Sequence, residues 1–481
     1  MKILLIDPPW YTLQGVNAAT VSLGLAAIAG VLEDRGHEVA LFNGDLYGSG
    51  PRYGESTLIG RQGTPEGEHP AYQRLREVLR QIRPEAVGIT CMTAEFPSVC
   101  VAAQIVRAED ASVPVVVGGV HPTLVPEEVL EYKCFDYVAI GEGEETAAAL
   151  FALLASGGNP ETVAGIAYRR AGAVTCTAKR PLIEDLDALP LPSYRGLIDR
   201  NSHIPADLGG VITSRGCPYP CLYCASKKLW TRRVRIRSVS RVLEEIAGLY
   251  REGVRLFRFQ DDTFTIRTDR VLAFCDGMKN FPGARWSCDT RVDLLEEGLA
   301  RKMRAAGCYQ INLGIESGSE RIRNLVAKKV DIATARRLVR MLKRCGIRVT
   351  AYFMIGLPTE TGPEMDETLA LARALAPDTP LFSVFTPYPG TELWDELRRA
   401  GKIPEKPDYG SFYHHSATMN FSAMGAIEFS SRLQTIHAYE QEQVRGARQL
   451  YLLCHPLRFV ADRRVLRPQL TRRFSGERWY S

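Results

Sequence analysis

The chain has 481 residues, of which 45% are hydrophobic and 24% are charged, with a formal net charge of +5. This length is too great for one ordinary hydrophobic core and predicts two or three domains. The composition is typical of a globular protein. A net charge this small for the length gives no reason to expect nucleic acid as a partner.

The beginning of the chain and its cysteines indicate the cellular setting. Residues 1–9 form a short apolar run without a basic leader or a cleavage site, so they indicate a buried strand and no signal peptide. No run of 18 apolar residues occurs, so we expect no membrane-spanning helix. The twelve cysteines are better explained by reduced thiols or metal ligands than by disulfides. We therefore expect a cytoplasmic protein.

Residues 1–178 alternate short apolar strands with helical stretches. This order predicts an α/β domain with a parallel, doubly wound, Rossmann-like sheet that binds ligands at the carboxyl ends of its strands. The expected strands are 2–7, 37–45, 86–90, 113–119 and 136–144, and the expected helices are 23–36, 97–109 and 126–132. Residues 47–70 predict an irregular loop, and residues 165–180 predict a small hairpin.

A second α/β series follows a linker at 179–204, which is rich in Pro and Asp and lacks periodicity. Residues 205–400 predict six strands separated by helices, an arrangement typical of a partial (βα)6 TIM-type barrel with its reactive groups at the C-terminal strand ends. The expected strands begin at Gly209 and continue at 255–264, 285–291, 310–318, 348–358 and 381–391. Residues 401–481 predict a helical C-terminal cap.

Three cysteines, Cys217, Cys221 and Cys224, lie together just after the first of these strands. Thiolates in a compact loop can bind one iron–sulfur cluster, and three ligands leave one iron open to a substrate or cofactor. Zinc is the competing interpretation, but a zinc site usually needs a fourth Cys or His, and His203 is the one candidate. Three unligated thiols are the third alternative.

The C-x3-C-x2-C spacing, with Tyr223 before the last cysteine, resembles the signature loop of the radical S-adenosylmethionine (SAM) family. Residues 259–264 (FQDDTF), 314–318 (GIESG), 356–361 (GLPTET) and 387–391 (PYPGT) extend the resemblance through the barrel. It implies that the three cysteines are the catalytic metal ligands, that a [4Fe-4S] cluster and SAM are cofactors, and that a flavodoxin-type or ferredoxin-type protein donates the electron. The SAM contacts that it implies are Tyr223, Asp262, Glu316, Ser317 and Gly356.

Each of these residues also has a structural interpretation. Asp261 and Asp262 point to opposite faces of a strand, so at most one should face the barrel mouth, and we prefer Asp262. Arg291 and Arg237 either hold the SAM carboxylate or substrate, or are solvated surface residues. Tyr352 and Tyr388 either line a substrate cavity or pack in the core.

The N-terminal domain resembles the cobalamin-binding domain that precedes many radical SAM barrels. The resemblance lies in DPPW, LGLAAIAGVLEDRGHEV, ITCMTAEFPS, VVVGGVHPT and IGEGEET. It implies cobalamin as a cofactor, with contacts from Pro8, Trp10, Thr90, Met92, Gly118, Gly119, His121, Gly141 and Glu142. The D-x-H-x-x-G motif of histidine-ligated cobalamin proteins is absent, so we interpret His121 as a turn or tail contact. Trp10 either covers the corrin or packs at a domain junction.

The C-terminal residues 441–481 contain nine arginines and three acidic residues. This basic segment predicts either peripheral contact with a membrane surface or an anionic substrate, or a helix packed on the barrel with a solvated basic face. Residues 411–424 are polar and aromatic and are placed to close the barrel mouth.

The resemblance leads to a functional hypothesis, methylation of an unactivated carbon of a small-molecule or lipid-like substrate by a deoxyadenosyl radical and methylcobalamin. The alternatives are oxidation, cyclisation or rearrangement on the same scaffold, as in tetrapyrrole-ring-forming relatives, and a cobalamin-binding sensor or carrier with a silent cluster. A methylthiotransferase is disfavoured because Cys91, Cys100, Cys134 and Cys176 form no compact second ligand set.

Overall fold

The N-terminal part of the chain is a seven-stranded sheet in the order β2-β1-β3-β4-β5-β6-β7. The computed structural model describes residues 1–16, 18–48, 69–414, 416 and 419–454. The strands are β1 (Lys2–Asp7), β2 (Glu38–Asn43), β3 (Ala86–Thr90), β4 (Val115–Gly118), β5 (Tyr137–Ala139), β6 (Ile166–Arg170) and β7 (Ala173–Cys176). The first five are parallel, and β6 and β7 continue the sheet as an antiparallel hairpin. The predicted Rossmann-like sheet is therefore confirmed.

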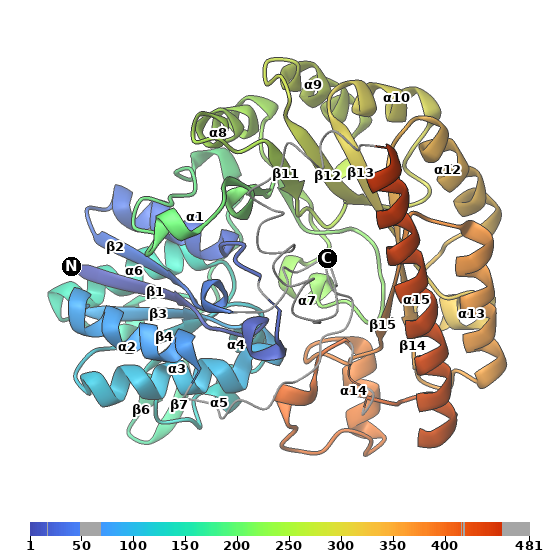
Figure 1. Cartoon of the computed structure of the whole chain (residues 1–481). Helices are drawn as coiled ribbons and strands as arrows, with labels where there is room; N and C mark the ends of the chain where they lie inside the picture. The colour runs from blue at the N-terminus through green and yellow to red at the C-terminus, as the bar shows by residue number, and fades with distance from the viewer. Residues whose placement is uncertain (17, 49–68, 415, 417–418, 455–481) are drawn as a thin grey trace, which may run out of the picture.

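Helices cover this sheet because its central strands are apolar on both faces. α1 packs with α6 and α2 packs with α3, and Figure 1 shows α2 and α3 along one side of the strands. The helices are α1 (Leu23–Asp34), α2 (Pro70–Ile82), α3 (Phe96–Glu109), α4 (Val120–Leu124), α5 (Pro126–Val129) and α6 (Gly143–Ser156). The side chain of Ser22 accepts from the backbone N–H of Leu25 at 3.4 Å and so caps α1.

The expected linker, 179–204, follows the edge of this sheet without a strand of its own. Leu197 forms an isolated parallel bridge with Leu41 of β2. Gly196 lies so close to β2 that a Cβ there would stand 1.9 Å from the carbonyl oxygen of Val39. Backbone contacts thus hold the segment against the N-terminal domain. These contacts could not be predicted from the amino-acid composition of the segment.

The second sheet has six parallel strands in the order β15-β14-β13-β12-β11-β8. The strands are β8 (Gly210–Val211), β11 (Leu256–Phe259), β12 (Arg285–Thr290), β13 (Cys308–Glu316), β14 (Arg348–Ile355) and β15 (Thr379–Val384). Its helices are α8 (Val239–Arg251), α9 (Thr268–Met278), α10 (Glu297–Ala305), α11 (Glu320–Leu325), α12 (Ile332–Arg344) and α13 (Gly362–Leu375). β8 and β15 are the two edges and do not pair, so the predicted six-stranded partial barrel is confirmed.

A small hairpin connects the first barrel strand to its helix. β9 (Ser214–Arg215) pairs antiparallel with β10 (Arg235–Ile236), and α7 (Ser226–Trp230) lies in the excursion between them. The three cysteines of the predicted cluster loop are in this excursion. In Figure 1, α7 lies between the N-terminal domain and the barrel.

The C-terminal part closes one side of the barrel. α14 (Glu392–Arg399) precedes α15 (Ala426–Cys454), which packs on β15 and α13. The buried carboxylate of Glu440 on α15 accepts from the backbone N–H of Phe382 in β15 at 2.6 Å. The basic segment beyond Cys454, and residues 415, 417 and 418 of the expected mouth-closing segment, lie outside the described residues.

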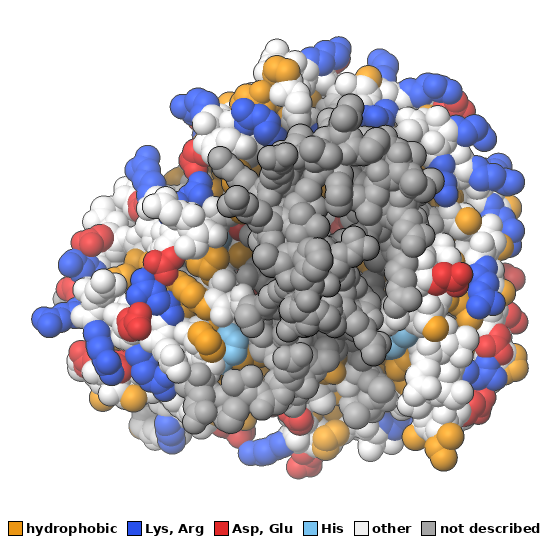
Figure 2. All heavy atoms as spheres, in the orientation of Figure 1, with side chains coloured by type: hydrophobic (Ala, Val, Ile, Leu, Met, Phe, Trp, Pro, Cys, Tyr) orange, Lys and Arg blue, Asp and Glu red, His pale blue; other side chains and the backbone are white. Residues whose placement is uncertain are grey.

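The exterior gives two further observations. Within the described part of the chain, no helix is both long and apolar enough to cross a membrane. On the face shown in Figure 2, outside the residues drawn grey, lysine and arginine side chains are interspersed with acidic ones around the rim of the molecule.

Candidate active site between the two domains

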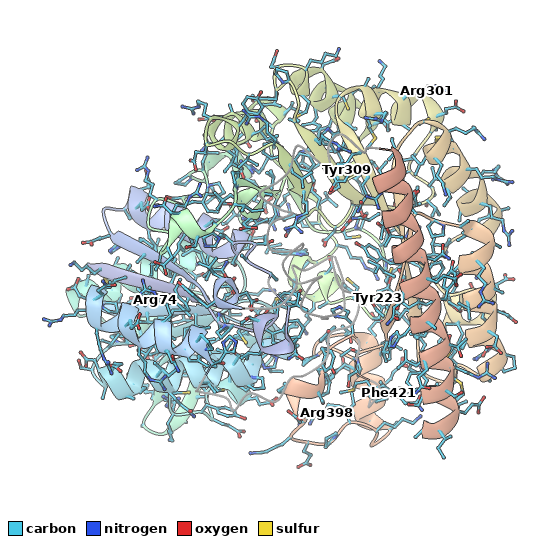
Figure 3. All side chains as sticks on the ribbon, in the orientation of Figure 1. Arg74, Tyr223, Arg301, Tyr309, Arg398 and Phe421 are labelled. Carbon is cyan, nitrogen blue, oxygen red and sulfur yellow. The ribbon has the colours of Figure 1, made fainter. Side chains whose placement is uncertain are left out.

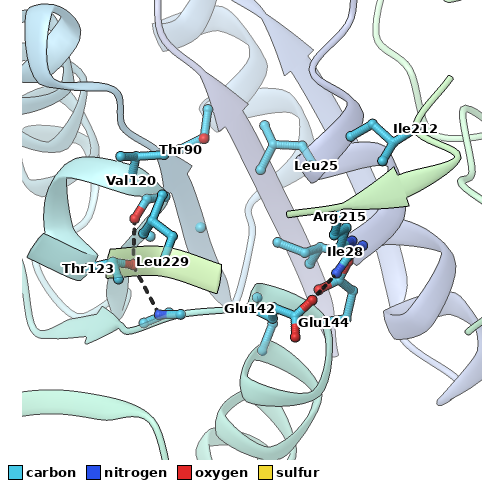
Figure 4. A pocket seen from close by; sticks show the side chains of 18 of the residues that line it. Leu25, Ile28, Thr90, Val120, Thr123, Glu142, Glu144, Ile212, Arg215 and Leu229 are labelled. Atoms are coloured by element: carbon cyan, nitrogen blue, oxygen red, sulfur yellow. Dashed lines mark hydrogen bonds and ion pairs between the residues drawn. The ribbon is translucent and has the colours of Figure 1, made fainter. Parts of the chain in front are cut away.

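A cavity of about 290 Å³ lies between the carboxyl ends of the N-terminal strands and the start of the barrel. Its N-terminal wall includes residues from β1, β3, β4 and β5 and from helices α1 and α6, and its other wall includes β9, α7 and the end of β11. Figure 4 shows Leu25, Thr90 and Glu142 on the first wall and Arg215 and Leu229 on the second. The cavity therefore joins two sets of residues that the sequence placed in separate domains.

Five of the residues expected to contact cobalamin line this cavity, namely Thr90, Gly118, Gly119, Gly141 and Glu142. At two of these positions the backbone conformation favours glycine over other residues. Gly119 has φ 111°, and a Cβ there would lie 2.7 Å from the carbonyl oxygen of Cys91. Gly141 has φ 85° and open space where its Cβ would be. The hydroxyl of Thr123 connects the two turns, accepting from the Gly141 N–H at 3.0 Å and donating to the Gly119 carbonyl at 2.7 Å.

The other four expected contacts, Pro8, Trp10, Met92 and His121, do not line the cavity. The Trp10 ring is buried and donates from Nε1 to the carbonyl of Ala94 at 3.1 Å, as a core residue would. Pro8 is buried, and Met92 is 48% exposed.

His121 is fully buried in an aromatic contact between the N-terminal domain and the C-terminal part. Its ring centroid lies 4.8 Å from that of Phe96 and 4.5 Å from that of Tyr409. Neither ring nitrogen has a hydrogen-bond partner among the described residues. Burial lowers the pKa of His121 to about 4, so the ring is neutral at physiological pH. Its side chain contacts the aromatic rings of Phe96 and Tyr409.

The cysteine loop begins at a turn that only glycine accommodates. Gly216 has φ 97°, and a Cβ there would lie 2.0 Å from the carbonyl oxygen of Arg233 across the β9–β10 hairpin. The Cys217 Sγ lies 3.8 Å from the Thr263 hydroxyl. The backbone N–H of Ser226 donates to the Cys224 Sγ at 3.4 Å.

Cys217, Cys221 and Cys224 are free cysteines. The first two are half-buried and Cys224 is exposed, in contrast to the buried Cys91, Cys100, Cys134, Cys275, Cys288 and Cys308. Among the described residues, no group of three or more Cys, His, Asp and Glu side chains converges tightly enough to hold a single metal ion. A cluster makes a different demand, because each of its irons takes its own thiolate. Three free cysteines on one short loop, none of them fully buried, fit that requirement.

Asp261 and Asp262 follow β11 and have separate contacts, because successive side chains of an extended chain point to opposite faces. The buried carboxylate of Asp261 accepts from the Thr213 N–H at 2.6 Å and from the hydroxyls of Thr213 and Ser214, and so fixes the start of the β9 hairpin. Asp262 lines the cavity and accepts from the Ser226 hydroxyl at 3.1 Å. Burial raises the pKa of Asp262 above its ordinary value.

Glu316 stands at the C-terminal end of β13, next to the cysteine loop. Its Oε1 accepts from the Tyr223 hydroxyl at 3.0 Å and lies 3.1 Å from the Lys328 Nζ. Its φ of 69° is left-handed, at a register shift between β13 and β14. Such a conformation costs about 1–3 kcal/mol in a residue other than glycine and is typical of functional sites. In Figure 3, Tyr223 is labelled near the centre of the view, on the side of the barrel.

The two remaining expected SAM contacts are held by internal hydrogen bonds. The fully buried Ser317 lies with its hydroxyl 3.1 Å from that of Thr368 and accepts from the Ser319 N–H at 3.1 Å. Gly356 has φ 75° and donates its N–H to Glu360 at 2.6 Å.

Two arginines and two tyrosines had two interpretations each in the sequence, a role at the site or an ordinary structural position. Arg237 pairs with Glu245 at 2.6 Å inside the scaffold. Arg291 stacks 3.7 Å over the Tyr219 ring of the cysteine loop. Tyr388 is half-buried and donates to the carbonyl of Phe412 at 3.4 Å, and Tyr352 is half-buried on β14.

A buried ion-pair network connects the two walls of the cavity, and sequence reasoning missed it. The Arg215 guanidinium reaches Glu142 at 2.5 Å and also contacts Glu144, while Arg235 reaches the other oxygen of Glu142 at 2.7 Å. The arginines flank the cysteine loop on β9 and β10, and the acids are in the IGEGEE segment. Both carboxylate oxygens of Glu142 are therefore occupied by cations of the barrel domain.

Comparisons with known proteins match both halves of this site. Residues 211–372 match the radical SAM superfamily and residues 15–151 match the B12 binding domain. The chain is 32% identical to an uncharacterized methyltransferase of Pyrococcus horikoshii over 401 residues, covering 82% of this chain and 83% of that protein. The chain belongs to the radical SAM superfamily. It is a radical SAM enzyme with a B12-binding domain.

Two further matches are a second curated protein and a solved structure. An anaerobic magnesium-protoporphyrin IX monomethyl ester cyclase of Cereibacter sphaeroides is 31% identical over 69% of this chain and 56% of its own length. The structure of the radical SAM methyltransferase TsrM from Kitasatospora setae, with cobalamin and a [4Fe-4S] cluster bound, superposes with a TM-score of 0.67 at 18% identity. The match covers 83% of this chain and 75% of that one. At that identity the superposition shows a shared fold.

As a radical SAM enzyme with a B12-binding domain, the protein uses a [4Fe-4S] cluster, SAM and cobalamin. The cavity volume lies near the lower end of the range for small-molecule sites, about 300–1,000 Å³, so it would enclose only part of a cobalamin. Its wall turns at Gly118, Gly119 and Gly141 allow close backbone approach, which fits a bulky ligand. No histidine occurs among the described residues that line it.

Proposed function

We propose that this radical SAM enzyme methylates an unactivated carbon of a small-molecule substrate. The observation that carries the proposal is the shared cavity, where Thr90 and Gly141 of the B12-binding domain and Asp262 beside the cysteine loop line one space. A radical generated on one side and a methyl donor held on the other must both reach the same carbon, so the two domains have to open onto a common volume.

The residues of the chain have distinct tasks in this proposal. Cys217, Cys221 and Cys224 would hold the cluster, and the Glu316 carboxylate would take a polar group of SAM. The glycine turns of the N-terminal strands would hold the cobalamin. When bound, these cofactors supply a hydrogen-abstracting radical and a methyl group. The apolar part of the wall, including Leu25, Ile28 and Leu229, would exclude water from that radical.

The relatives lend support of two kinds. The Pyrococcus horikoshii protein carries the name of a methyltransferase and matches this chain over most of both lengths. The Cereibacter sphaeroides relative is a cyclase, which favours oxidation or cyclisation on the same scaffold as the second candidate function. An oxidation or cyclisation of that kind requires no methylated cobalamin.

The half-reaction that loads the methyl group separates the two candidates without knowledge of the substrate. The anaerobically purified, cluster-reconstituted protein is incubated with hydroxocobalamin, a strong reductant and methyl-labelled SAM. Methyl transfer predicts near-stoichiometric retained cobalamin, labelled methylcobalamin and S-adenosylhomocysteine. Retained cobalamin with deoxyadenosine as the sole SAM product would contradict methyl transfer and favour the second candidate.

The Cys221→Ala variant provides the matched control for the cluster. We expect it to lose deoxyadenosine formation while keeping its fold, because Cys221 is a loop residue outside the buried core. Retained SAM cleavage in this variant would contradict the assignment of the three cysteines as cluster ligands. An acidic flavodoxin-type or ferredoxin-type donor in place of the chemical reductant tests the proposed electron source.

A further inference from the structure

The cysteine loop is held by a short turn, residues 326–329, that sequence reasoning did not single out. The backbone N–H of Leu222, between two of the cysteines, donates to the Val326 carbonyl at 3.2 Å. The next residue, Ala327, has φ 53°, a left-handed conformation. The side chain of the following residue, Lys328, reaches Glu316 at the end of β13.

Lys328 is a lysine with an unusual degree of burial, since only 12% of its side chain is exposed. Lysine is rarely buried without a partner, because removing an ammonium from water is costly. Its partner is Glu316, 8% exposed, at 3.1 Å. The same oxygen of Glu316 accepts from Tyr223, so Lys328, Glu316 and the residue before Cys224 form one continuous polar group.

A second cation approaches the same loop from β12. Arg291 stacks over Tyr219 at 3.7 Å and donates to the carbonyl of Lys329 at 3.1 Å, so it joins the loop to the turn. Lys328 lies on the turn that accepts from the Leu222 N–H, directly after Cys221, and Arg291 lies over Tyr219, two residues before Cys221. Two cations, Lys328 and Arg291, therefore pack next to the loop that carries the cluster ligands.

We infer that Lys328 is a positioning residue of the cluster site, with two linked tasks. Its ammonium contacts Oε1 of Glu316 and so holds this residue in the left-handed strand-end conformation. Its charge also stabilises the more negative, reduced state of a cluster on the loop, since cluster potentials depend on the net charge nearby. The inference rests on the proposed role of the cysteines and is independent of methyl transfer.

The test compares midpoint potentials of reconstituted holoenzymes by redox titration followed by electron paramagnetic resonance, without SAM. Lys328→Met removes a buried positive charge, so its potential should become more negative, and Lys328→Arg should retain most of the wild-type value. Lys329→Met is the matched control, because Lys329 is exposed and contributes only its carbonyl to the site. Its potential should equal that of the wild type.

Glu316→Gln tests the sign of the effect. Removing the negative partner should shift the potential in the positive direction, and the double variant Lys328→Met/Glu316→Gln should return toward the wild-type value, because the net charge of the pair is then restored. SAM affinity, measured by equilibrium dialysis on the holoenzyme, should fall about tenfold or more in Lys328→Met, where Glu316 is left without its partner.

The possible results distinguish a failure of the inference about Lys328 from a failure of the cluster assignment. An unchanged potential in a fully cluster-loaded Lys328→Met protein would overturn the inference and leave the cluster assignment intact. A shift of equal size in Lys329→Met would also overturn it, because surface charge would then account for the effect. A wild-type protein that takes up no iron would overturn the cluster assignment and the inference together.

Discussion

At the scale of single residues, several buried acids of this protein are held in places that oppose their ionisation. Glu440 of α15 is the example furthest from the site. It is 1% exposed, its partner is the Phe382 N–H, and burial raises its pKa to about 8. The carboxyl group of an unfolded chain has a pKa of 4.5. The folded state therefore binds a proton that the unfolded state has released over the range between these values.

The contribution of Glu440 to stability should be greatest below pH 4.5 and be lost as the pH rises through 8. Glu440→Gln keeps an acceptor for Phe382 but cannot ionise. Relative to the wild type, the variant should gain on the order of 1–3 kcal/mol of stability between pH 5 and pH 8.5. Thermal unfolding at both pH values checks this. The exposed Glu442→Gln on the same helix is the control and should show no pH-dependent difference. A Glu440→Gln effect that is equal at both pH values would refute the prediction.

At the scale of elements, the β9–β10 hairpin decides whether the cysteine loop forms. β9 and β10 pair over only two residues each, which alone is too little for a stable hairpin. The pairing is supported by Asp261, which fixes Thr213 and Ser214, and by the tight turn at Gly216. The position of the cysteines thus depends on a close backbone approach at one glycine.

Gly216→Ala should open this hairpin. The substitution adds a Cβ 2.0 Å from a backbone oxygen at φ 97°, so we expect a loss of more than about 2 kcal/mol and much reduced iron uptake. Gly283→Ala is the matched control, because Gly283 has φ 79° and no atom within 4 Å of its Cβ position. Iron content after anaerobic reconstitution and thermal unfolding measure the two effects. Equal iron content in both variants would show that the contact at Gly216 is not decisive.

At the scale of the whole molecule, two of the contacts that join the B12-binding domain to the rest of the chain involve residues expected to bind cobalamin. One is the ion-pair network of Glu142 and Glu144 with Arg215 and Arg235 beside the cavity. The other is the aromatic contact of His121 with Tyr409, whose hydroxyl donates to Glu128 at 3.0 Å. The first contact couples the wall expected to hold cobalamin directly to the loop expected to hold the cluster.

Glu142→Ala should uncouple the domains. It leaves two buried guanidinium groups without their shared partner, which costs roughly 3–5 kcal/mol in comparable buried pairs. We expect the calorimetric unfolding transition to split or broaden and hydroxocobalamin binding to weaken. Glu145→Ala is the control, because its contact with Arg35 is exposed and long, at 3.8 Å, and such pairs contribute about 0–1 kcal/mol. Unchanged cobalamin affinity in Glu142→Ala would show that the network serves the fold alone.

Local patterns of the sequence determined much of this protein. The apolar strands, the helices between them, the six-stranded barrel and the compact cysteine loop all follow from periodicity and spacing within short segments, where neighbouring residues alone set the signal. The family resemblance rests on the same local motifs, and the match to the radical SAM superfamily and the B12 binding domain confirms it.

Only the tertiary structure decided which of the motif residues meet. It brought Glu142 against Arg215 and Arg235, residues 73 and 93 positions later in the chain. It placed Lys328 on Glu316 through a left-handed turn at Ala327, and it left Trp10 and His121 outside the cavity. Burial and charge pairing between distant segments depend on how the two sheets pack. A surface lysine and a buried, paired lysine therefore have the same appearance in a sequence.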